Sequence, residues 1–258
     1  MTENQISIDD LKVNYKIAGE GFPFLILHGW GGSSNSWNVV QDILSKSGYK
    51  VISIDLPGFG KTPSPQVPWE IKDYSDFILK FVEKLKLGKI ILLGHSFGGR
   101  ISIKFASLHP ERLEKLVLFA SAGIKHPWNF RKRIIYSFVA IGNFILSPKF
   151  LRRVKDLARN IFYISIRQRD YTKVKGAMRE TFKKVVDEDL APDLSRISTN
   201  TLIVWGERDN AVPLADAYFI KEKISKSILK IIPNVGHTLN LENPEKLSET
   251  ILKFLGKA

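Results

Sequence analysis

Residues 90–113, IILLGHSFGGRISIKFASLHPERL, decide how this chain folds. Residues 90–93 are a short apolar run with branched side chains, which is typical of a buried β-strand. From Phe97 onward the apolar residues are spaced closer to a helical period, so a strand becomes a helix at Ser96. Glycines stand two residues before and two residues after this serine. Ser96 is therefore either a nucleophile on a tight turn or a small residue in an ordinary glycine-containing turn.

The same change from strand to helix repeats along the chain. Apolar runs predict strands at Ile6–Tyr15, Phe22–His28, Val51–Asp55, Ile90–Gly94, Leu116–Ala120, Thr201–Trp205 and Ile228–Ile232. Helical spacing predicts helices at Trp37–Ser47, Asp73–Leu85, Phe97–Leu108, Leu214–Ile224 and Pro244–Phe254. Continuous apolar strands that alternate with helices are typical of a mostly parallel sheet covered on both faces. We therefore expect the α/β class.

The alternation is interrupted between residues 122 and 200, where the spacing is helical and no convincing strand occurs. This stretch is also strongly basic, because residues 122–196 hold 17 Lys or Arg against 7 Asp or Glu in a chain of net charge +13. We expect a core of residues 1–121 and 201–258 with a helical insertion at 122–200.

Composition excludes several classes of protein. The 258 residues are 44% hydrophobic and 25% charged, as in an ordinary globular domain with a large core. Cysteine is absent, which excludes disulfides, thiolate catalysis and cysteine-ligated metal. The N-terminal segment MTENQISIDD has neither a basic start nor an apolar core, so we expect no secretory signal and a cytoplasmic protein.

The stretch at 94–98, GHSFG, fits the G-x-S-x-G nucleophile elbow in its required context of strand and helix. A serine hydroxyl is a weak nucleophile and needs a base to take its proton. His237 is the best candidate because it follows the last expected strand, at the sheet edge where Ser96 also lies. The other histidines have less suitable positions: His28, His95, His109 and His126.

A third group must accept the other ring N–H of the base and hold its tautomer. The segment TLIVWGERDNAVP ends an expected strand at the same edge, and we assign this role to its Asp209. Glu207 is the competing carboxylate, expected to be a solvated loop residue. No acid follows the strand Leu116–Ala120, so that alternative position is empty.

Two backbone N–H groups can hold an oxyanion beside Ser96. One is that of Phe97, at the start of a helix, and the other is that of Trp30 in the glycine-rich segment HGWGG at 28–32. A phosphate-binding loop is disfavoured, because neither of the usual glycine-rich phosphate motifs is present. Asp55 is expected to bind backbone rather than to take part in chemistry.

Together these motifs resemble the α/β-hydrolase superfamily, in the branch with a helical cap. The matching segments, in family order, are HGWGG (28–32), DLPGFG (55–60), GHSFGG (94–99), WGERD (205–209) and GH (236–237). The resemblance implies a triad of Ser96, Asp209 and His237, with oxyanion N–H groups from Trp30 and Phe97. It also implies an α/β-hydrolase fold whose cap is inserted after the sixth strand. No cofactor and no metal are implied.

A serine nucleophile indicates attack on a carbonyl group, because an ether formed at saturated carbon could not be released by water. We expect a carboxylesterase acting on a small-molecule acyl substrate through an acyl-enzyme. The main alternative is a carbon–carbon hydrolase of ring-fission diketones, although such relatives tend to carry Asn where His95 stands. Other acyl chemistry, including acyl transfer, and a non-catalytic binding protein on the same fold are lesser alternatives.

The basic insertion contains RKRIIYSFVAIGNFILSPKFLRRVK at 131–155, whose apolar part is shorter than the about 20 residues that span a bilayer. We expect a cap helix whose apolar face covers the active site. Weak association with an anionic membrane surface is the alternative, and no nucleic acid is expected because no recognition motif accompanies the charge. Candidates for an apolar acyl pocket are Trp128, Phe130, Phe138 and Phe144.

Overall fold

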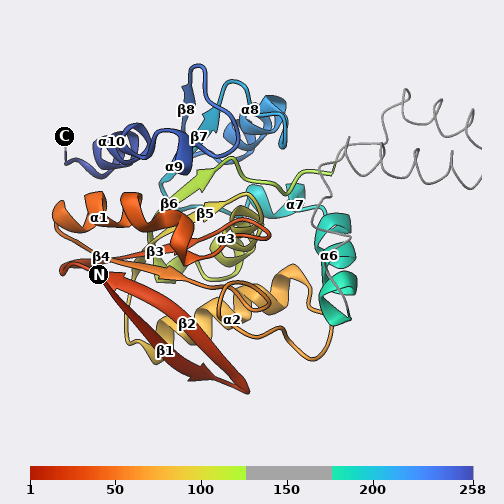
Figure 1. The fold of residues 1–258 in the computed structure, drawn as a ribbon. Coiled ribbons are helices and arrows are strands. Elements are labelled where there is room, and N and C mark those ends of the chain that lie inside the picture. The colour runs from red at the N-terminus through yellow and green to blue at the C-terminus, as the bar shows by residue number, and fades with distance from the viewer. Residues whose placement is uncertain (126–175, 258) are drawn as a thin grey trace, which may run out of the picture. The chain divides into compact units, whose positions relative to one another are not determined.

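The computed structural model describes residues 1–125 and 176–257. Within them, eight strands form one sheet in the order β1-β2-β4-β3-β5-β6-β7-β8 (Figure 1). The strands are β1 (Thr2–Ile8), β2 (Leu11–Ala18), β3 (Phe22–Leu27), β4 (Tyr49–Ile54), β5 (Ile90–His95), β6 (Leu113–Phe119), β7 (Thr201–Gly206) and β8 (Ser227–Ile232). From β4 to β8 across the sheet all neighbours are parallel, while β2 is antiparallel to both β1 and β4. The expected α/β class with a mostly parallel sheet is confirmed.

Helices cover both faces of the sheet. Their bounds are α1 (Asn38–Lys46), α2 (Ile71–Lys84), α3 (Phe97–Leu108), α6 (Ala177–Asp187), α7 (Ala191–Leu194), α8 (Leu214–Lys223), α9 (Leu239–Glu242) and α10 (Pro244–Leu255), with short 3₁₀ turns at Ser34–Trp37 and Pro110–Arg112. Helices α1 and α10 pack together on one face, and α2, α3 and α8 lie on the other (Figure 1). This arrangement explains why β5 and β7 are buried along their whole length and consist mostly of apolar residues, since both of their faces are covered.

One expected element was wrong. The run Ile6–Tyr15 is not a single strand but parts of β1 and β2, which form an antiparallel hairpin with Ile8 opposite Leu11. The chain reverses at Asp9, whose φ of 47° lies in the left-handed region. Aspartate tolerates this conformation better than most residues, so the pair of aspartates marked a turn. The other expected strands and helices coincide with observed ones, apart from shifts at their ends.

Contacts divide the chain into two compact units, Met1–Ile124 with Gly176–Ala258, and Lys125–Lys175. The predicted cap helix at 131–155 lies outside the described residues, as do the four aromatic pocket candidates between 126 and 150. The boundaries 1–121, 122–200 and 201–258 stay a prediction. The last part of the expected insertion, α6 and α7, belongs to the same unit as the sheet.

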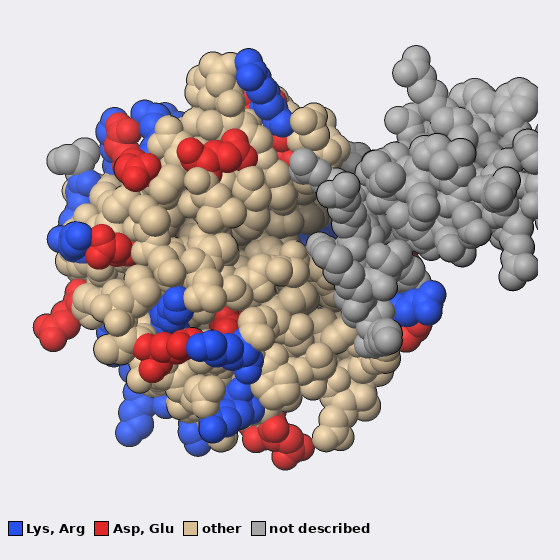
Figure 2. Space-filling view, in the orientation of Figure 1, with Lys and Arg blue, Asp and Glu red and all other residues tan. Residues whose placement is uncertain are grey.

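Figure 2 shows Lys and Arg mixed with Asp and Glu over the face that it presents, rather than gathered into a field of one sign. The basic surplus that the sequence assigns to 122–196 falls largely on residues that are not described. Among the helices that are described, none is long and apolar enough to cross a membrane.

Candidate active site

Ser96 lies at the junction of β5 and α3. Its backbone has φ 53° and ψ −108°, a conformation that residues other than glycine rarely adopt. Its main chain is held on both sides. The Ser96 N–H donates to the carbonyl of Phe119 at 3.1 Å, and the Ser96 carbonyl accepts from the N–H of Ala122 at 3.2 Å. Ser96 as a whole residue is half-buried, whereas its neighbours His95 and Phe97 are buried. Such strain held in place by surrounding bonds is typical of functional positions.

The two glycines beside Ser96 are required by close approaches of the chain. A Cβ on Gly94 would overlap the Ser102 hydroxyl, and a Cβ on Gly98 would overlap the Leu27 carbonyl at the end of β3. The Gly98 N–H also donates to the carbonyl of His28 at 3.1 Å. The glycine pattern therefore packs α3 directly against β3 and its following loop, and this contact sets the direction in which the turn points.

His237 and Asp209 form a short hydrogen bond. The Nδ1–H of His237 donates to Oδ2 of Asp209 at 2.7 Å, and the Asp209 side chain has 0% exposure against 14% for His237. The other carboxylate oxygen of Asp209, Oδ1, accepts from the N–H groups of Ala211 at 2.8 Å and Val212 at 2.9 Å. Burial by itself raises the pKa of Asp209. The hydrogen bond from His237, the electrostatic interaction with His237 and the two N–H groups together outweigh burial, so the pKa of Asp209 lies below its usual value.

Ser96, Asp209 and His237 all lie at one edge of the sheet. Asp209 follows β7, His237 follows β8, and Ser96 follows β5, so all three stand beyond the carboxyl ends of parallel strands. The rings of His237 and His95, the residue before Ser96, have centroids 4.8 Å apart. Glu207, the competing acid, is exposed and accepts the Asn234 N–H at 3.0 Å, as expected of a loop carboxylate.

Two side chains to which the sequence analysis assigned no such role, those of Glu242 and His95, hold the loop of His237. Glu242 accepts the N–H of Gly236 at 2.8 Å through Oε2 and the N–H of Thr238 at 3.2 Å through Oε1. His95 donates from Nε2 to the carbonyl of His237 at 3.0 Å. A main-chain group of each of three consecutive residues is therefore bound by a side chain. The sequence carries no signal for these bonds, because they depend on how the loop is folded.

The segment at 28–32 brings Trp30 beside Phe97, with ring centroids 5.1 Å apart. Among the described residues, the N–H groups of Trp30 and Phe97 have no hydrogen-bond partner. Phe97 is the first residue of α3, where the N-terminal end of the helix favours negative charge. Within the part of the chain that the structure describes, both N–H groups are therefore unoccupied donors.

Aromatic rings gather around Trp30. Besides Phe97, its ring meets Phe59 at 4.8 Å and Phe182 of α6 at 4.9 Å. Helix α6 is also tied to the core by the Trp69 N–H, which donates to the Thr181 hydroxyl at 2.9 Å. Phe59 and Phe182 were not predicted from the sequence, because these rings meet Trp30 only after the chain has folded.

Arg100, one turn after Ser96, holds the far end of α6. Its Nη1 donates to the carbonyls of Val185 at 2.7 Å and Glu188 at 2.9 Å. Burial lowers the pKa of Arg100 to about 10, so the side chain stays charged at neutral pH. A cation is favourable at the C-terminal end of a helix, and Arg100 therefore anchors α6 against α3.

Asp55 and His28 have structural roles, which confirms the expectation for Asp55. The Asp55 carboxylate accepts the N–H of Ser34 at 2.7 Å and that of Lys61 at 2.9 Å. The ring of His28 accepts the Leu56 N–H on Nε2 at 3.0 Å, and its Nδ1–H donates to the Gly29 carbonyl at 2.7 Å. Together they connect the loop of Trp30 to the loop after β4.

The buried histidines predict that the protein loses stability in acid. Burial lowers the pKa of His28 to about 4, and burial together with the adjacent His237 lowers that of His95 to about 3. A histidine in an unfolded chain has a pKa of about 6.5, so below that pH the unfolded chain binds protons that the native protein excludes. As the pH falls from about 6 to about 4, we expect each histidine to lower the free energy of unfolding by about 1 kcal/mol per pH unit.

His28→Gln tests this expectation, because glutamine keeps an acceptor for the Leu56 N–H but does not titrate. Urea unfolding between about pH 4 and pH 8 measures how the free energy of unfolding depends on pH. Below pH 6 the slope should be smaller in the variant than in the wild type, by the amount that corresponds to one bound proton. Above pH 7 the slopes of the two proteins should be equal. Equal slopes in acid would contradict the assignment of His28 as a neutral buried group.

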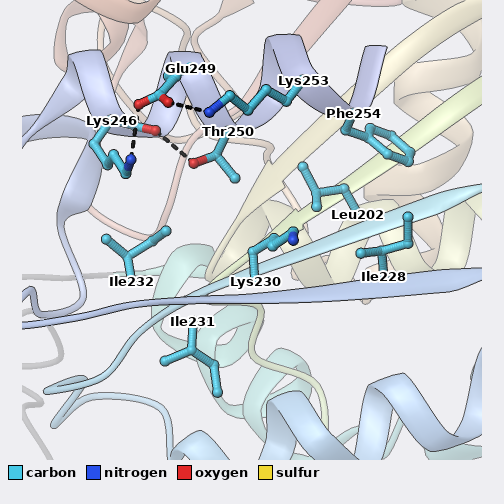
Figure 3. Close-up of a pocket in the computed structure, with 10 residues that line it drawn as sticks. All are labelled: Leu202, Ile228, Lys230, Ile231, Ile232, Lys246, Glu249, Thr250, Lys253 and Phe254. Atoms are coloured by element: carbon cyan, nitrogen blue, oxygen red, sulfur yellow. Dashed lines mark hydrogen bonds and ion pairs between the residues drawn. The ribbon is translucent and has the colours of Figure 1, made fainter. Parts of the chain in front are cut away.

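The structure has a cavity away from the candidate catalytic residues. It has a volume of about 410 Å³ and lies between α10 and strands β7 and β8, with the side chains of Lys246, Glu249 and Lys253 on one side and that of Lys230 extending from β8 (Figure 3). None of the candidate catalytic residues lines this cavity. Within residues 1–125 and 176–257, no group of three or more His, Asp or Glu is placed to hold a metal ion.

Comparisons with known proteins agree with this architecture. Residues 23–244 match the family described as alpha/beta hydrolase fold. Among curated proteins, the chain is 31% identical over 96% of its length to a 2-hydroxy-6-oxononadienedioate/2-hydroxy-6-oxononatrienedioate hydrolase of Escherichia coli O81 (strain ED1a), covering 92% of that protein. It is 29% identical over 94% of its length to the dihydrolipoyllysine-residue acetyltransferase component of the acetoin cleaving system of Pseudomonas putida, of which it spans 66%.

Among solved structures, an esterase of Exiguobacterium antarcticum superposes with a TM-score of 0.75 over 99% of this chain and 100% of the other, at 24% identity. At that identity the likeness concerns the fold. The extent of the family match, from β3 to the start of α10, includes the expected nucleophile elbow and the loops of Asp209 and His237. The chain belongs to the alpha/beta hydrolase family.

Proposed function

We propose that this protein is a serine hydrolase that cleaves carboxylic esters through an acyl-enzyme, with Ser96, His237 and Asp209 as its triad. The observation that carries the proposal is the 2.7 Å bond between His237 Nδ1 and Asp209, beside a strained serine at the carboxyl edge of the sheet. A histidine held by a buried carboxylate on Nδ1 keeps Nε2 free to accept a proton.

Each residue then has a defined task. Ser96 Oγ forms a bond to the ester carbonyl carbon while its proton passes to His237 Nε2. The tetrahedral intermediate collapses, the bond to the alcohol oxygen breaks, and that oxygen takes the proton from His237. A water molecule attacks the acyl-enzyme in the same way, which releases the acid and restores Ser96. Asp209 stabilises the imidazolium that forms in both halves of the reaction.

The oxyanion of each tetrahedral intermediate would be held by the N–H groups of Trp30 and Phe97. Their lack of another partner among the described residues supports this role, as does the helix N-terminus at Phe97. Donors fixed in advance stabilise the charge as it develops, without a further rearrangement.

The acyl group of the substrate is proposed to be small or medium in size and apolar. The support for this is the aromatic cluster of Trp30, Phe59, Phe97 and Phe182, which surrounds one of the proposed oxyanion donors. An apolar chain gains free energy by leaving water for such a surface. The described cation nearest to Ser96 in the sequence, Arg100, is engaged with main-chain carbonyls of the α6 end.

A second candidate is a carbon–carbon hydrolase of ring-fission diketones. The relative from Escherichia coli O81 favours it, because its name describes a substrate with a ketone and two carboxylates. The same serine could attack that ketone, but the departing group would then be a carbanion, which needs a proton on carbon. His95 favours ester hydrolysis over carbon–carbon hydrolysis, because such carbon–carbon hydrolases tend to have asparagine at its position.

We further propose a cytoplasmic location and a small-molecule substrate.

The test is a comparison of kcat/KM for p-nitrophenyl esters, from acetate to laurate, with that for a ring-fission diketone carrying a carboxylate. We expect ester turnover to exceed diketone turnover, with the highest kcat/KM at short or medium acyl chains. Turnover of the diketone alone would replace the ester proposal by the carbon–carbon alternative. Failure of both substrates with a folded protein would count against the reaction class.

A further inference from the structure

The side chain of His95 joins the two segments on which the proposed reaction depends. His95 is the last residue of β5 and directly precedes Ser96. Its Nε2–H donates to the main-chain carbonyl of His237, 142 residues further along the chain, at 3.0 Å. One hydrogen bond therefore connects the turn that carries the nucleophile to the loop that carries the base.

The ring of His95 is fixed by its surroundings. It stacks on Phe119 with centroids 4.6 Å apart and an interplanar angle of 20°, and Trp37 packs edge-on at 6.0 Å. Burial, with a smaller contribution from His237, lowers the pKa of His95 to about 3, so the ring is neutral at ordinary pH. A neutral imidazole has one N–H, and the carbonyl partner places it on Nε2.

The bond engages the main chain of His237 and leaves its ring available. The ring Nδ1 is occupied by Asp209, while Glu242 holds the N–H groups of the residues before and after His237. Glu242 lies on α9 in the same local segment, so its bonds shape the loop but do not place it relative to Ser96. Of these contacts, the bond from His95 is the one that ties the loop to the elbow.

We propose that His95 is a positioning residue, which sets the placement of His237 relative to Ser96 through its bond to the His237 carbonyl. This inference rests on the proposed function, because placement matters only if the two residues react together. A misplacement of about 1 Å at a reacting centre can cost about a hundredfold in rate. Loss of the donor should therefore lower kcat and leave KM nearly unchanged, since no substrate-binding surface is altered.

Two substitutions separate the donor from the ring. His95→Phe keeps an aromatic ring against Phe119 but has no N–H to donate. His95→Gln lacks the ring but carries an amide N–H that is the same number of bonds from Cβ as Nε2 of histidine. His95→Leu serves as the donor-free variant if the phenylalanine variant does not fold.

Trp37→Phe is the matched control for packing. It removes part of the surface that contacts the His95 ring without touching the donor, and among the described residues the Trp37 Nε1 has no hydrogen-bond partner to lose. This variant should lose stability because a large buried side chain becomes smaller, but its kcat should stay within about twofold of the wild type.

We expect kcat for the best p-nitrophenyl ester to fall by about tenfold to a hundredfold in His95→Phe, with KM within about twofold. His95→Gln should recover most of the loss. Equal kcat in His95→Phe and the wild type would overturn the proposal. So would an equal loss of kcat in the Phe and Gln variants, since the effect would then come from packing rather than from the donor.

A second measurement needs no substrate. The His237 Nδ1 proton in its bond to Asp209 should give a strongly downfield proton resonance in NMR spectra, and Ser96→Ala should retain it. In His95→Phe, or in His95→Leu if the phenylalanine variant does not fold, we expect the resonance to broaden or disappear, and in His95→Gln to persist. An unchanged resonance in the donor-free variant would overturn the proposal even if no substrate is hydrolysed, so its failure is distinct from that of the proposed function.

Discussion

Replacement of Ser96 by alanine is expected to lower kcat for ester hydrolysis by about 10⁵- to 10⁶-fold. The variant retains a Cβ and the same strained backbone, so the bonds of the elbow to Phe119 and Ala122 should persist. The change in the free energy of unfolding should therefore stay within about 1 kcal/mol. Only the attacking oxygen is lost, and the remaining groups cannot replace it. Initial rates with the best p-nitrophenyl ester, together with urea unfolding, measure both quantities.

Ser121→Ala is the matched control. Ser121 also lies at the carboxyl edge of the sheet, just after β6, but its hydroxyl donates to the carbonyl of Ala122 at 3.0 Å. This variant should keep kcat within about threefold of the wild type. Residual activity of Ser96→Ala above about 1% of the wild type would show that another group performs the attack.

The second large effect is expected from Asp209→Asn, which should lower kcat by about 10⁴-fold at neutral pH. The N–H groups of Ala211 and Val212 point at the position of Oδ1, so they will select the amide oxygen there. The amide NH₂ then faces Nδ1 of His237 in place of Oδ2. Nδ1 must become an acceptor, which moves the ring proton to Nε2, and a protonated Nε2 cannot take the proton of Ser96.

Glu207→Gln provides the control for this prediction. It makes the same chemical change in a neighbouring carboxylate that accepts the Asn234 N–H from an exposed position. We expect its kcat to stay within about twofold of the wild type. An equal loss of activity in the two variants would mean that the carboxylates act through the charge of the loop and not through the tautomer of His237.

The elbow and the pairing of His237 with Asp209 were predictable from sequence, because Ser96, Asp209 and His237 each come shortly after an apolar run that is typical of a buried strand. Glycines at fixed offsets from Ser96 impose the turn, and in an open parallel sheet the residues after successive strands meet at one edge. Asp209 was distinguished from Glu207 by its place beyond the Gly206 turn. The structure places its carboxylate on His237 and leaves Glu207 exposed.

The contacts that shape the site were not predictable in the same way. From the sequence, Arg100 is indistinguishable from any other basic residue on a helix. In the structure its partners are main-chain carbonyls 85 and 88 residues away. The sequence likewise predicts that the side chain of His95 points away from Ser96. Its partner, the main-chain carbonyl of His237, depends on the path of a loop that is distant in the sequence. The hairpin at Asp9 was missed because the apolar residues on its two sides look like one strand, although their alternation shifts phase at the two aspartates, from Ile6 and Ile8 to Leu11 and Val13.

The central claim is that Ser96 carries the acyl group. Rapid mixing of the wild-type protein with p-nitrophenyl acetate, followed by an acid quench and mass spectrometry of peptides, tests it directly. We expect a burst of about one p-nitrophenolate per chain and an acetyl mass on the peptide that contains Ser96. Steady turnover with the acetyl group on another residue, or with no covalent adduct at any time, would contradict it.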